Sequence, residues 1–568
     1  MPTQRKKLLG QMLLEKNLIS QKQLEEALAK QKEMGELLGT VLVEMGYIDH
    51  EMDLLPVIAE QYSVNYVYLK SLLLRNDVIE RIPYRFAHDH HVLALDFFDN
   101  VLTVAMSKPY DIMLCDEIKL LTNMEIKPVL AGRYDIDEAI KKYYGIGADT
   151  IEKIMGSEDS SHEQTSLIED IDEIFSEATI GNFLNQIFLE AYHRRATDIH
   201  IEPFENHMAI RYRIDGLLYD IHVPDNIGHF KDSLCSRIKI MANLDISEKR
   251  LPQDGRLRVR VDNNYLDLRI SFLPTPHGES AVIRILNSTK LYSFDELDLS
   301  ENDKAIMDDL IQKSHGIIFI TGPTGSGKTT TLYSALSKIN TVEKKIITLE
   351  DPVEYQLKGI TQIQINSGIQ FTFSRGLRSI LRHDPDVIMV GEVRDVETAE
   401  IAIQVALTGH LIFSTLHTND AASGITRLLN MGVEPYLITS TVECFIAQRL
   451  VRVLCPKCKS PRELSPAYLE KLGIPITPFE NVTFYEPKGC SRCNFSGYVG
   501  RTGIFEFLII NEEIAELILN RATASQIKQK AMEYGMTTLR QSGWEKAKRG
   551  MTTPEEVLRV TQDRSKRK

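Results

Sequence analysis

The sequence of 568 residues predicts an α/β protein of several domains. Three features indicate this fold class: a helical repeat at the start, alternating apolar residues in the middle, and buried strands followed by helices after residue 315. The length suggests about three to five compact domains. In chain order we expect an N-terminal domain (1–145) made of helical repeats (1–62) and an α+β unit (63–145), a flexible linker (146–176), a second α+β domain (177–290) and an α/β domain (291–568).

The first 62 residues contain an internal repeat. "LLGQMLLEKNLIS" begins at Leu8, and "LLGTVLVEMGYID" begins 29 residues later at Leu37. Each copy continues to an apolar residue followed by a helix-capping residue, Ser20 in the first and Asp49 in the second. Because Ser20 has Gln23 three residues later, it can form a capping box. Each copy therefore predicts a helical hairpin.

The strands of the middle region alternate apolar and polar residues. "HVLALDF" and "VLTVAMS" belong to the α+β unit, and a polar, acidic segment without a strong period then predicts the linker. A helix around 179–194 precedes five predicted strands, "MAIRYRI", "LLYDIHV", "RLRVRV", "YLDLRIS" and "AVIRIL". Arg256, Arg258 and Arg260 share one strand face, as do Arg211 and Arg213. Two interpretations stay open: a solvated sheet surface, or one that faces phosphate or another subunit.

After residue 315, continuous apolar strands alternate with helices. "GIIFIT", "KKIITLE", "DVIMVGE" and "HLIFSTL" are too uniformly apolar for a half-exposed sheet. They predict a parallel sheet with helices on both faces.

A phosphate-binding loop follows the first of these strands. "GPTGSGKT" fits G-x-x-x-x-G-K-[ST], in which glycines let backbone N–H groups approach phosphate oxygens and the lysine adds a positive charge. Thr329 is the expected Mg²⁺ ligand. The expected nucleotide contacts are Gly322, Pro323, Thr324, Gly325, Ser326, Gly327, Lys328, Thr329 and Thr330.

Acidic and histidine residues follow neighbouring strands of the same sheet. Glu392 ends "DVIMVGE", where such sheets place the acid that acts on Mg²⁺ or on the attacking water. "TLEDPVEY" adds Glu350, Asp351 and Glu354, which we expect to order metal-bound water. His410 and His417 flank another strand, and their spacing fits a structural role as well as a phosphate-sensing one.

Four of the seven cysteines form two CxxC pairs, Cys455 with Cys458 and Cys490 with Cys493. In a reducing compartment such pairs predict a metal site rather than disulfides. Four thiolates suit a closed, structural Zn²⁺ site, which places a zinc-binding insert at residues 451–500.

The charge and hydropathy of the chain limit the classes of partner that it can bind directly. The net charge of −13 and the isoelectric point near 5.7 give no overall attraction to nucleic acid. No apolar stretch approaches the ~18 residues of a membrane-spanning helix. We therefore expect a cytosolic protein that reaches a membrane through partners only.

Seven stretches together resemble the secretion ATPase superfamily, the motors of bacterial type II secretion and type IV pili. These stretches are "DIHIEPFE", "KRLPQDGRL", "LPTPHGE", "GPTGSGKTTTLY", "LEDPVEY", "LRHDPDVIMVGEVRD" and "STLHTNDA". The resemblance covers nearly the whole chain. It implies a hexameric ring that hydrolyses ATP, with a PAS-like domain at 177–290 and a RecA-like domain at 291–568 that includes the C-terminal helices.

The resemblance also implies roles for individual residues. Glu392 corresponds to the Walker B glutamate, and His417 lies in the family's His box, which favours its phosphate-sensing role. Arg269 and Arg284 resemble arginines that reach the nucleotide of a neighbouring subunit. Arg378 and Arg382 look like further arginines near the subunit junction.

Within the superfamily, the large N-terminal region and the four-cysteine insert resemble the ATPases that assemble type IV pili and their type II secretion relatives. The implied partners are an inner-membrane platform protein and pilus alignment proteins. The N-terminal repeat looks like a module that binds cyclic di-GMP in some members, but Leu8 and Leu37 replace its usual arginine. A nucleic-acid translocase and a non-hydrolysing scaffold are the remaining alternatives. Salt-sensitive, DNA-stimulated turnover would support the translocase, and undetectable ATP turnover with Mg²⁺ would support the scaffold.

Overall fold

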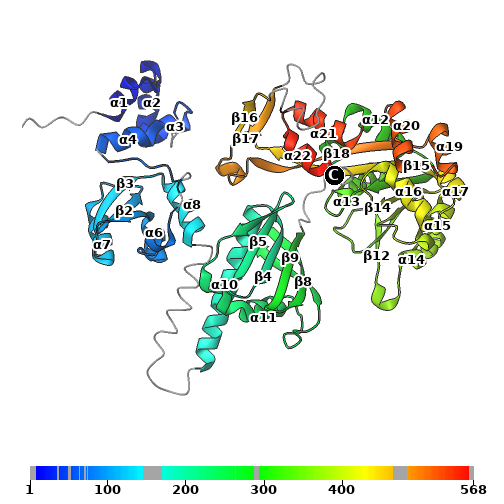
Figure 1. Cartoon of the computed structure of the whole chain (residues 1–568), viewed down its shortest axis with the longest axis horizontal. Coiled ribbons are helices and arrows are strands. Elements are labelled where there is room, and N and C mark those ends of the chain that lie inside the picture. Colours follow the sequence, from blue (N-terminus) through cyan, green and yellow to red (C-terminus); the bar gives the residue numbers. More distant parts are fainter. Residues whose placement is uncertain are drawn as a thin grey trace, which may run out of the picture. The chain divides into compact units, whose positions relative to one another are not determined.

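The computed structural model describes residues 8–561, with the exception of 35–37, 49–52, 63, 70–71, 73, 145–168, 262–263, 287–292, 465–467 and 469–482. The chain divides into two compact units. Figure 1 labels their helices and strands. The first contains residues 1–214 and 218–285, and the second contains residues 215–217 and 286–568.

The first unit begins with the two predicted helical hairpins. Their helices are α1 (Leu9–Glu15), α2 (Gln21–Met34), α3 (Leu38–Glu44) and α4 (Leu55–Tyr62). The Ser20 capping box is confirmed: the Ser20 N–H donates to Gln23 Oε1 at 2.8 Å, and the Gln23 N–H donates to Ser20 Oγ at 3.3 Å. Asp49, the cap expected in the second copy, lies outside the described residues.

The α+β unit follows as a three-stranded sheet with four helices. Its elements are α5 (Asn76–Ile79), α6 (Tyr84–His90), β1 (Val92–Phe98), β2 (Val101–Met106), α7 (Ile112–Thr122), β3 (Glu125–Leu130) and α8 (Arg133–Tyr144). Strand β2 pairs antiparallel with β1 and parallel with β3. A core of its own, which includes Leu93, Val104 and Ile136, lies between this sheet and the helices.

The second α+β domain is a six-stranded sheet in the order β6-β5-β4-β9-β8-β7. Its elements are α10 (Glu169–His193), β4 (Ala196–Pro203), β5 (Met208–Ile214), β6 (Leu217–Ile221), α11 (Lys231–Met241), β7 (Gln253–Val261), β8 (Asn264–Thr275) and β9 (Gly278–Leu286). The buried Tyr212 hydroxyl joins sheet and helix, because it donates to the Ile187 carbonyl at 2.8 Å. Helix α10 begins ten residues before the expected position near 179, inside the range expected for the linker. Most of that linker, residues 145–168, lies outside the described residues.

The second unit contains a seven-stranded sheet in the order β12-β11-β13-β14-β10-β15-β18. Its strands are β10 (Gly316–Thr321), β11 (Ile346–Glu350), β12 (Thr361–Gln364), β13 (Val387–Val390), β14 (Leu411–Leu416), β15 (Val442–Leu454) and β18 (Tyr498–Ile509). Six strands are parallel as expected, but β18 runs antiparallel to β15 at one edge. The four strands predicted from the sequence, β10, β11, β13 and β14, are parallel, whereas the antiparallel β18 was not among the predicted strands. The chain between the end of β15 at Leu454 and the start of β18 at Tyr498 contains the cysteine region, and β18 returns beside β15 in the opposite direction.

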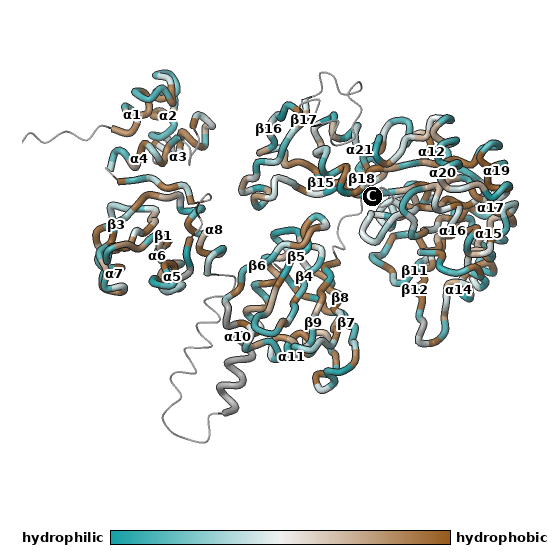
Figure 2. The backbone as a smooth tube through the Cα atoms, viewed as in Figure 1, coloured by the Kyte–Doolittle hydropathy of each residue, from teal (hydrophilic) through white to brown (hydrophobic). Residues whose placement is uncertain are grey.

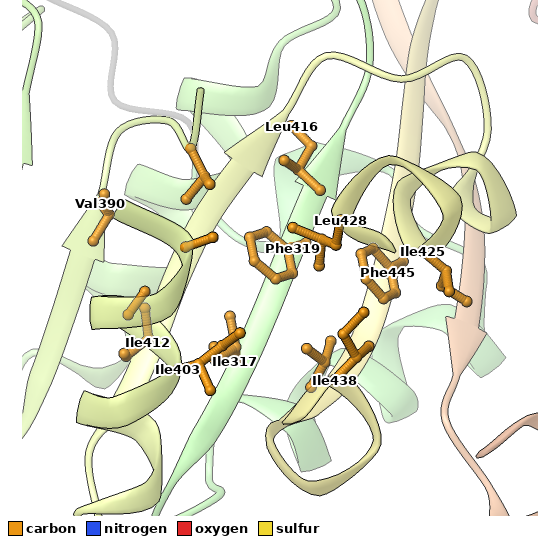
Figure 3. Packing of buried hydrophobic residues seen from close by; sticks show 14 of the residues in the cluster. Ile317, Phe319, Val390, Ile403, Ile412, Leu416, Ile425, Leu428, Ile438 and Phe445 are labelled. Carbon is orange, nitrogen blue, oxygen red and sulfur yellow. The ribbon is translucent and has the colours of Figure 1, made fainter. Parts of the chain in front are cut away.

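Apolar residues on the two faces of β10 build two separate cores. Ile317 and Phe319 point to one face, and Ile318 and Ile320 point to the other. On the first face the Phe319 and Phe445 rings stack at 5.3 Å, beneath the helices drawn in Figure 3. Full burial of one such side chain contributes about 1.5–3 kcal/mol. The long strands β15 and β18 are correspondingly hydrophobic along much of their length (Figure 2).

Helices cover both faces of this sheet. They are α12 (Glu301–Leu310), α13 (Lys328–Ile339), α14 (Phe373–Ile380), α15 (Val396–Leu407), α16 (Ala421–Met431), α17 (Pro435–Thr441), α19 (Glu512–Leu519), α20 (Ala524–Glu533), α21 (Leu539–Lys548) and α22 (Pro554–Thr561). Among the residues that the structure describes, no helix combines the length and apolar character needed to cross a bilayer.

A buried carboxylate on β18 joins the C-terminal helices to the rest of the sheet. Glu506 is fully buried and accepts hydrogen bonds from the N–H groups of Ala421 at 3.0 Å and Leu539 at 3.2 Å, the first residues of α16 and α21. Lys528 of α20 lies 3.3 Å from the same carboxylate and 3.0 Å from Asp420. Because the negative charge meets two helix N-termini and an ammonium group, its burial is compensated.

Candidate functional site

The phosphate-binding loop connects β10 to α13 at the carboxyl edge of the sheet. Gly322 and Gly327 have φ angles of +153° and +88°, which side-chain-bearing residues rarely adopt. A Cβ atom on Gly322 would lie 2.6 Å from the Gln448 carbonyl oxygen, and one on Gly327 would lie 2.9 Å from Gln448 Nε2. Both glycines are therefore required by the neighbouring strand β15 as well as by the loop itself.

Gln448 also fixes the helix that follows the loop. This residue is buried on β15, and its Oε1 accepts a hydrogen bond from Thr331 Oγ1 on α13 at 2.9 Å. Sequence reasoning missed Gln448, because it lies about 120 residues from the loop along the chain. The contact holds the N-terminus of α13, whose unpaired N–H groups and positive dipole end favour bound phosphate.

Lys328 is the first residue of α13. Its ammonium group donates hydrogen bonds to the carbonyls of Gly322 at 2.9 Å and Pro323 at 3.1 Å. Burial lowers the pKa of Lys328 to about 8; Glu392 opposes this shift and Arg449 adds to it. The lysine is thus charged at neutral pH but close to its titration range.

We expect ATP binding to weaken above pH 8. In the nucleotide-free protein Lys328 loses its proton as the pH rises through about 8, whereas bound phosphates favour the charged form. Binding above this pH therefore takes up a proton, and the apparent dissociation constant should rise by up to about tenfold per pH unit. Below this range the affinity should change little. Calorimetric titration of ATP in two buffers of different ionisation enthalpy measures the proton uptake.

The control for this titration is the same pair of buffers at about pH 7, where Lys328 is mostly charged with or without ATP and the heats should agree. Equal heats in both buffers at about pH 9 would contradict the assignment.

Glu392 lies two residues beyond β13, next to the phosphate-binding loop. Its Oε2 is 3.4 Å from His417 Nε2, and its Oε1 forms an ion pair with Arg394. The strands bring these groups together: Leu416 pairs with Thr321, and the Gly322 N–H donates to the Leu416 carbonyl at 3.2 Å. His417, the next residue, consequently lies beside the loop. Burial and the charge of Lys328 lower the pKa of His417, so its imidazole is neutral at pH 7.

Arg394 is a further residue of this cluster that sequence reasoning missed. Its side chain is 70% exposed, and its charge meets that of Glu392, whose side chain is only 12% exposed. In the sequence, the one signal for Arg394 is its position two residues after Glu392. No local pattern predicts that its side chain points toward the Glu392 carboxylate.

The acidic segment after β11 is organised around Glu350. This carboxylate is buried and accepts hydrogen bonds from the Tyr333 hydroxyl, from Thr348 Oγ1 at 2.5 Å and from Gln362 Nε2 at 3.1 Å. Both Glu350 oxygens are therefore used by protein donors. Glu354 lies further along the same segment, and its N–H approaches the Tyr333 hydroxyl at 3.4 Å.

The other predicted histidine, His410, lies before β14, at the opposite end of that strand from His417. Its Nδ1 is 3.0 Å from both the Val405 carbonyl and Thr408 Oγ1 at the end of α15. These contacts are those of a helix-terminating residue, and they favour the structural interpretation of His410.

The predicted arginines lie in both units. In the first unit, Arg284 of β9 donates to Asp198 Oδ1 at 2.9 Å, and Arg269 lies on β8. In the second, Arg378 pairs with Glu397 at 2.9 Å, and Arg382 donates to the Arg378 carbonyl at 3.2 Å.

Several arginines on the basic strands of the first unit pair with carboxylates of their own sheet. Arg258 contacts Asp267 at 2.7 and 3.2 Å, Arg211 Nε contacts Glu202 at 2.8 Å, and Arg213 lies 3.7 Å from Asp198. These ion pairs favour a solvated sheet surface over a phosphate-facing one for these three arginines.

The four CxxC cysteines come together in the second unit. Their sulfur atoms all lie within 4.8 Å of one another, and three of the separations are 3.8 Å. Zn–S bonds of ~2.3 Å in a tetrahedron require S···S separations of about 3.8 Å, so the residues fit a zinc ion. The N–H groups of Cys490 and Gly497 donate to Cys493 Sγ at 3.1 and 3.3 Å, which stabilises a thiolate.

The cysteine region packs on the C-terminal helices. Between its CxxC pairs lie strands β16 (Lys459–Arg462) and β17 (Phe484–Pro487), which pair antiparallel. Phe484 shares a small core with Trp544, Ala547 and Val557 of α21 and α22. A metal bound here would have no open coordination position, so its role would be to hold this contact.

The chain matches two family models and is similar in sequence to known bacterial ATPases and secretion proteins. Residues 173–559 match the family model "Type II/IV secretion system protein", and residues 62–150 match the "MshEN domain". The type IV pilus assembly ATPase PilB of Myxococcus xanthus is 42% identical over 557 residues, which cover 97% of this chain and 98% of the relative. The type II secretion system protein E of Xanthomonas campestris is 45% identical over 487 residues, 85% of each chain.

The similarity extends to solved structures. The X-ray structure of the ATPase DotB from Yersinia pseudotuberculosis superposes with a TM-score of 0.50 at 19% identity, and covers 67% of this chain and 93% of that one. At this identity the superposition shows the fold alone.

Proposed function

Because the chain belongs to the Type II/IV secretion system protein family and is a P-loop ATPase, we propose that it powers the assembly of type IV pili. The observation that carries this proposal is the extent of the match to the pilus assembly ATPase, which includes the N-terminal domain and nearly the full length of both chains. In the proposed activity, ATP hydrolysis drives pilin subunits out of the inner membrane through a platform protein.

The second candidate is a type II secretion motor with the same chemistry and another client. Its support is the slightly higher identity of the type II secretion relatives over a shorter part of the chain. Because the catalytic groups are shared, only an experiment on the client separates the two.

The proposal is tested in cells whose only copy carries Lys328→Ala. Loss of the ammonium group removes the charge that holds the phosphates, so we expect no surface pili and normal protein secretion. Pili are counted by electron microscopy, and secreted protein by gel. The exposed Lys358, in the same domain, gives the matched control Lys358→Ala, which should leave both unchanged. Retained pili with blocked secretion would assign the secretion client instead.

At the site, we propose that Lys328 holds the β- and γ-phosphates and that Thr329 binds Mg²⁺. ATP supplies the phosphoryl group and Mg²⁺ neutralises its developing charge. Glu392 orients the attacking water, and neutral His417 donates a hydrogen bond toward the γ-phosphate. Glu354 orders metal-bound water, while the buried Glu350 fixes the segment that carries it.

The proposed assembly is a homohexamer in which arginines act between subunits. Arg269 and Arg284 would reach the nucleotide of a neighbouring subunit, with Arg378 and Arg382 near the junction. An arginine that arrives only when a junction closes stabilises transition-state charge at that moment, which couples hydrolysis to movement.

The remaining assignments complete this proposal. The domains are those at 1–145, 177–290 and 291–568, joined by the linker at 146–176, with Zn²⁺ in the region 451–500. The motor works at the cytoplasmic face of the inner membrane, held there by the platform and pilus alignment proteins, without nucleic acid. We also propose cyclic di-GMP as an N-terminal regulator, on the resemblance of the repeat at residues 1–62, and a calorimetric titration without binding at physiological concentration would exclude it.

A further inference from the structure

Helix α13 carries a buried tyrosine shortly after the phosphate-binding residues. Tyr333 lies five residues beyond Lys328, about 7.5 Å along the helix, and is fully buried. Its ring packs edge-to-face on Tyr355, with centroids 4.6 Å apart. A phenylalanine would fill the same space, so the hydroxyl must find hydrogen-bond partners to be tolerated here.

The Tyr333 hydroxyl has three such partners, two on the chain at and after the end of β11 and one on β12. It donates to Glu350 at the end of β11, and the Glu354 N–H and Gln362 Nε2 each approach it at 3.4 Å. Burial and the neighbouring Glu350 raise the pKa of Tyr333, so the hydroxyl keeps its proton and remains a donor.

Gln362 of β12 holds the same acidic segment from the other side. Its Nε2 donates to the Tyr355 carbonyl at 3.2 Å and to Glu350 at 3.1 Å, and its Oε1 accepts from the Leu357 N–H at 2.7 Å. The segment 354–357 is therefore held by hydrogen bonds to Tyr333 on one side and Gln362 on the other. The Glu350 carboxylate accepts hydrogen bonds from both of these side chains and so fixes their positions.

We infer that Tyr333 is a positioning residue that transmits the position of the phosphate-binding helix to the segment 354–357. The inference rests on the proposed function, because it concerns the same ATP site. When bound phosphates attract the N-terminus of α13, the helix moves as a rigid body and the Tyr333 hydroxyl moves with it. The hydrogen bond between this hydroxyl and the Glu354 N–H then moves the Glu354 backbone. Glu354 then reaches its working position only when nucleotide is bound.

The test is Tyr333→Phe in the full-length protein, assayed for Mg²⁺-dependent ATP hydrolysis. The substitution keeps the ring and removes only the hydroxyl. A carboxylate displaced by about 1 Å lowers turnover by roughly ten- to a hundredfold, so kcat should fall by at least about tenfold. Because the phosphate-binding loop is intact, KM for Mg-ATP should stay within about twofold of the wild type.

Thr348→Val is the matched control. Thr348 is fully buried and donates to the same Glu350 carboxylate, while the hydrogen bonds that hold residues 354–357 run through Tyr333 and Gln362. Both substitutions deprive Glu350 of one donor, but only Tyr333→Phe releases the segment. Thr348→Val should retain kcat within about twofold.

Gln362→Leu provides a second test, because it releases the segment from β12 and removes the Gln362 contact to the Tyr333 hydroxyl, while the Tyr333 side chain itself stays in place. We expect it to reproduce the selective loss of kcat. If Tyr333→Phe does not fold, as judged by thermal unfolding, Gln362→Leu decides alone. Equal kcat values for the positioning variant and Thr348→Val would overturn the inference. Absence of ATP turnover in the wild-type protein, measured first in the same assay, would instead overturn the proposed function.

Discussion

Replacing Glu392 with Gln is expected to abolish ATP turnover while ATP remains bound. The amide keeps the size of the side chain and can still accept a hydrogen bond from Arg394, but it cannot take a proton from water. Loss of a positioned general base lowers the rate by roughly 10²- to 10⁴-fold. Steady-state phosphate release measures the loss, and fluorescence anisotropy with a labelled nucleotide measures the retained affinity.

The control for this substitution is Glu400→Gln, on the exposed side of α15, which follows shortly after Glu392 in the chain. It makes the same chemical change away from the site and should leave turnover unchanged. Normal turnover in Glu392→Gln would mean that another carboxylate, with Glu354 the nearest candidate in the proposal, handles the water.

Replacing Cys490 with Ser is expected to release zinc and loosen the C-terminal helices. Structural zinc binding has an apparent free energy of about 10–16 kcal/mol, so the loss of one thiolate should lower the unfolding temperature by many degrees. The chain offers a direct reporter, since its single tryptophan, Trp544, is buried against Phe484 of the cysteine region. Its fluorescence should shift to longer wavelength as water reaches the ring.

Metal content by atomic emission accompanies the fluorescence. We expect one zinc per chain in the wild type and none in Cys490→Ser, whereas Cys115→Ser, outside the site, should retain the metal and the emission. A wild-type protein that contains no zinc and whose Trp544 emission equals that of Cys490→Ser would rule out the zinc site.

Local patterns predicted the parts of the fold that local interactions determine. The Ser20 capping box needs only residues three apart, and the strand at Met208–Ile214 follows from its own alternation. The place of the phosphate-binding loop between a strand and a helix was likewise predicted, because its motif lies within eight residues.

Contacts between distant strands could not be predicted in the same way. Gln448 supports the loop only because β15 lies next to β10, a neighbour relation that no local pattern encodes. From the sequence, Tyr333 is indistinguishable from an ordinary aromatic residue of the core. Only the folded structure places Glu350 of β11 and Gln362 of β12 next to its hydroxyl. The antiparallel edge strand β18 and the early start of α10 were missed for a related reason, since their limits depend on packing partners rather than on periodicity.

Glu506 sets a lower limit on the length of a functional ATPase fragment. The sheet is complete at Ile509, yet a chain cut there would lose both Lys528 and the Leu539 N–H, and would leave a buried carboxylate without most of its compensation. The same cut would release Asp420, which begins the helix directly after the His417 segment. Helices α20 and α21 are thus inseparable from the catalytic sheet, and insertions or fusions are better placed after residue 561 than between Ile509 and α21.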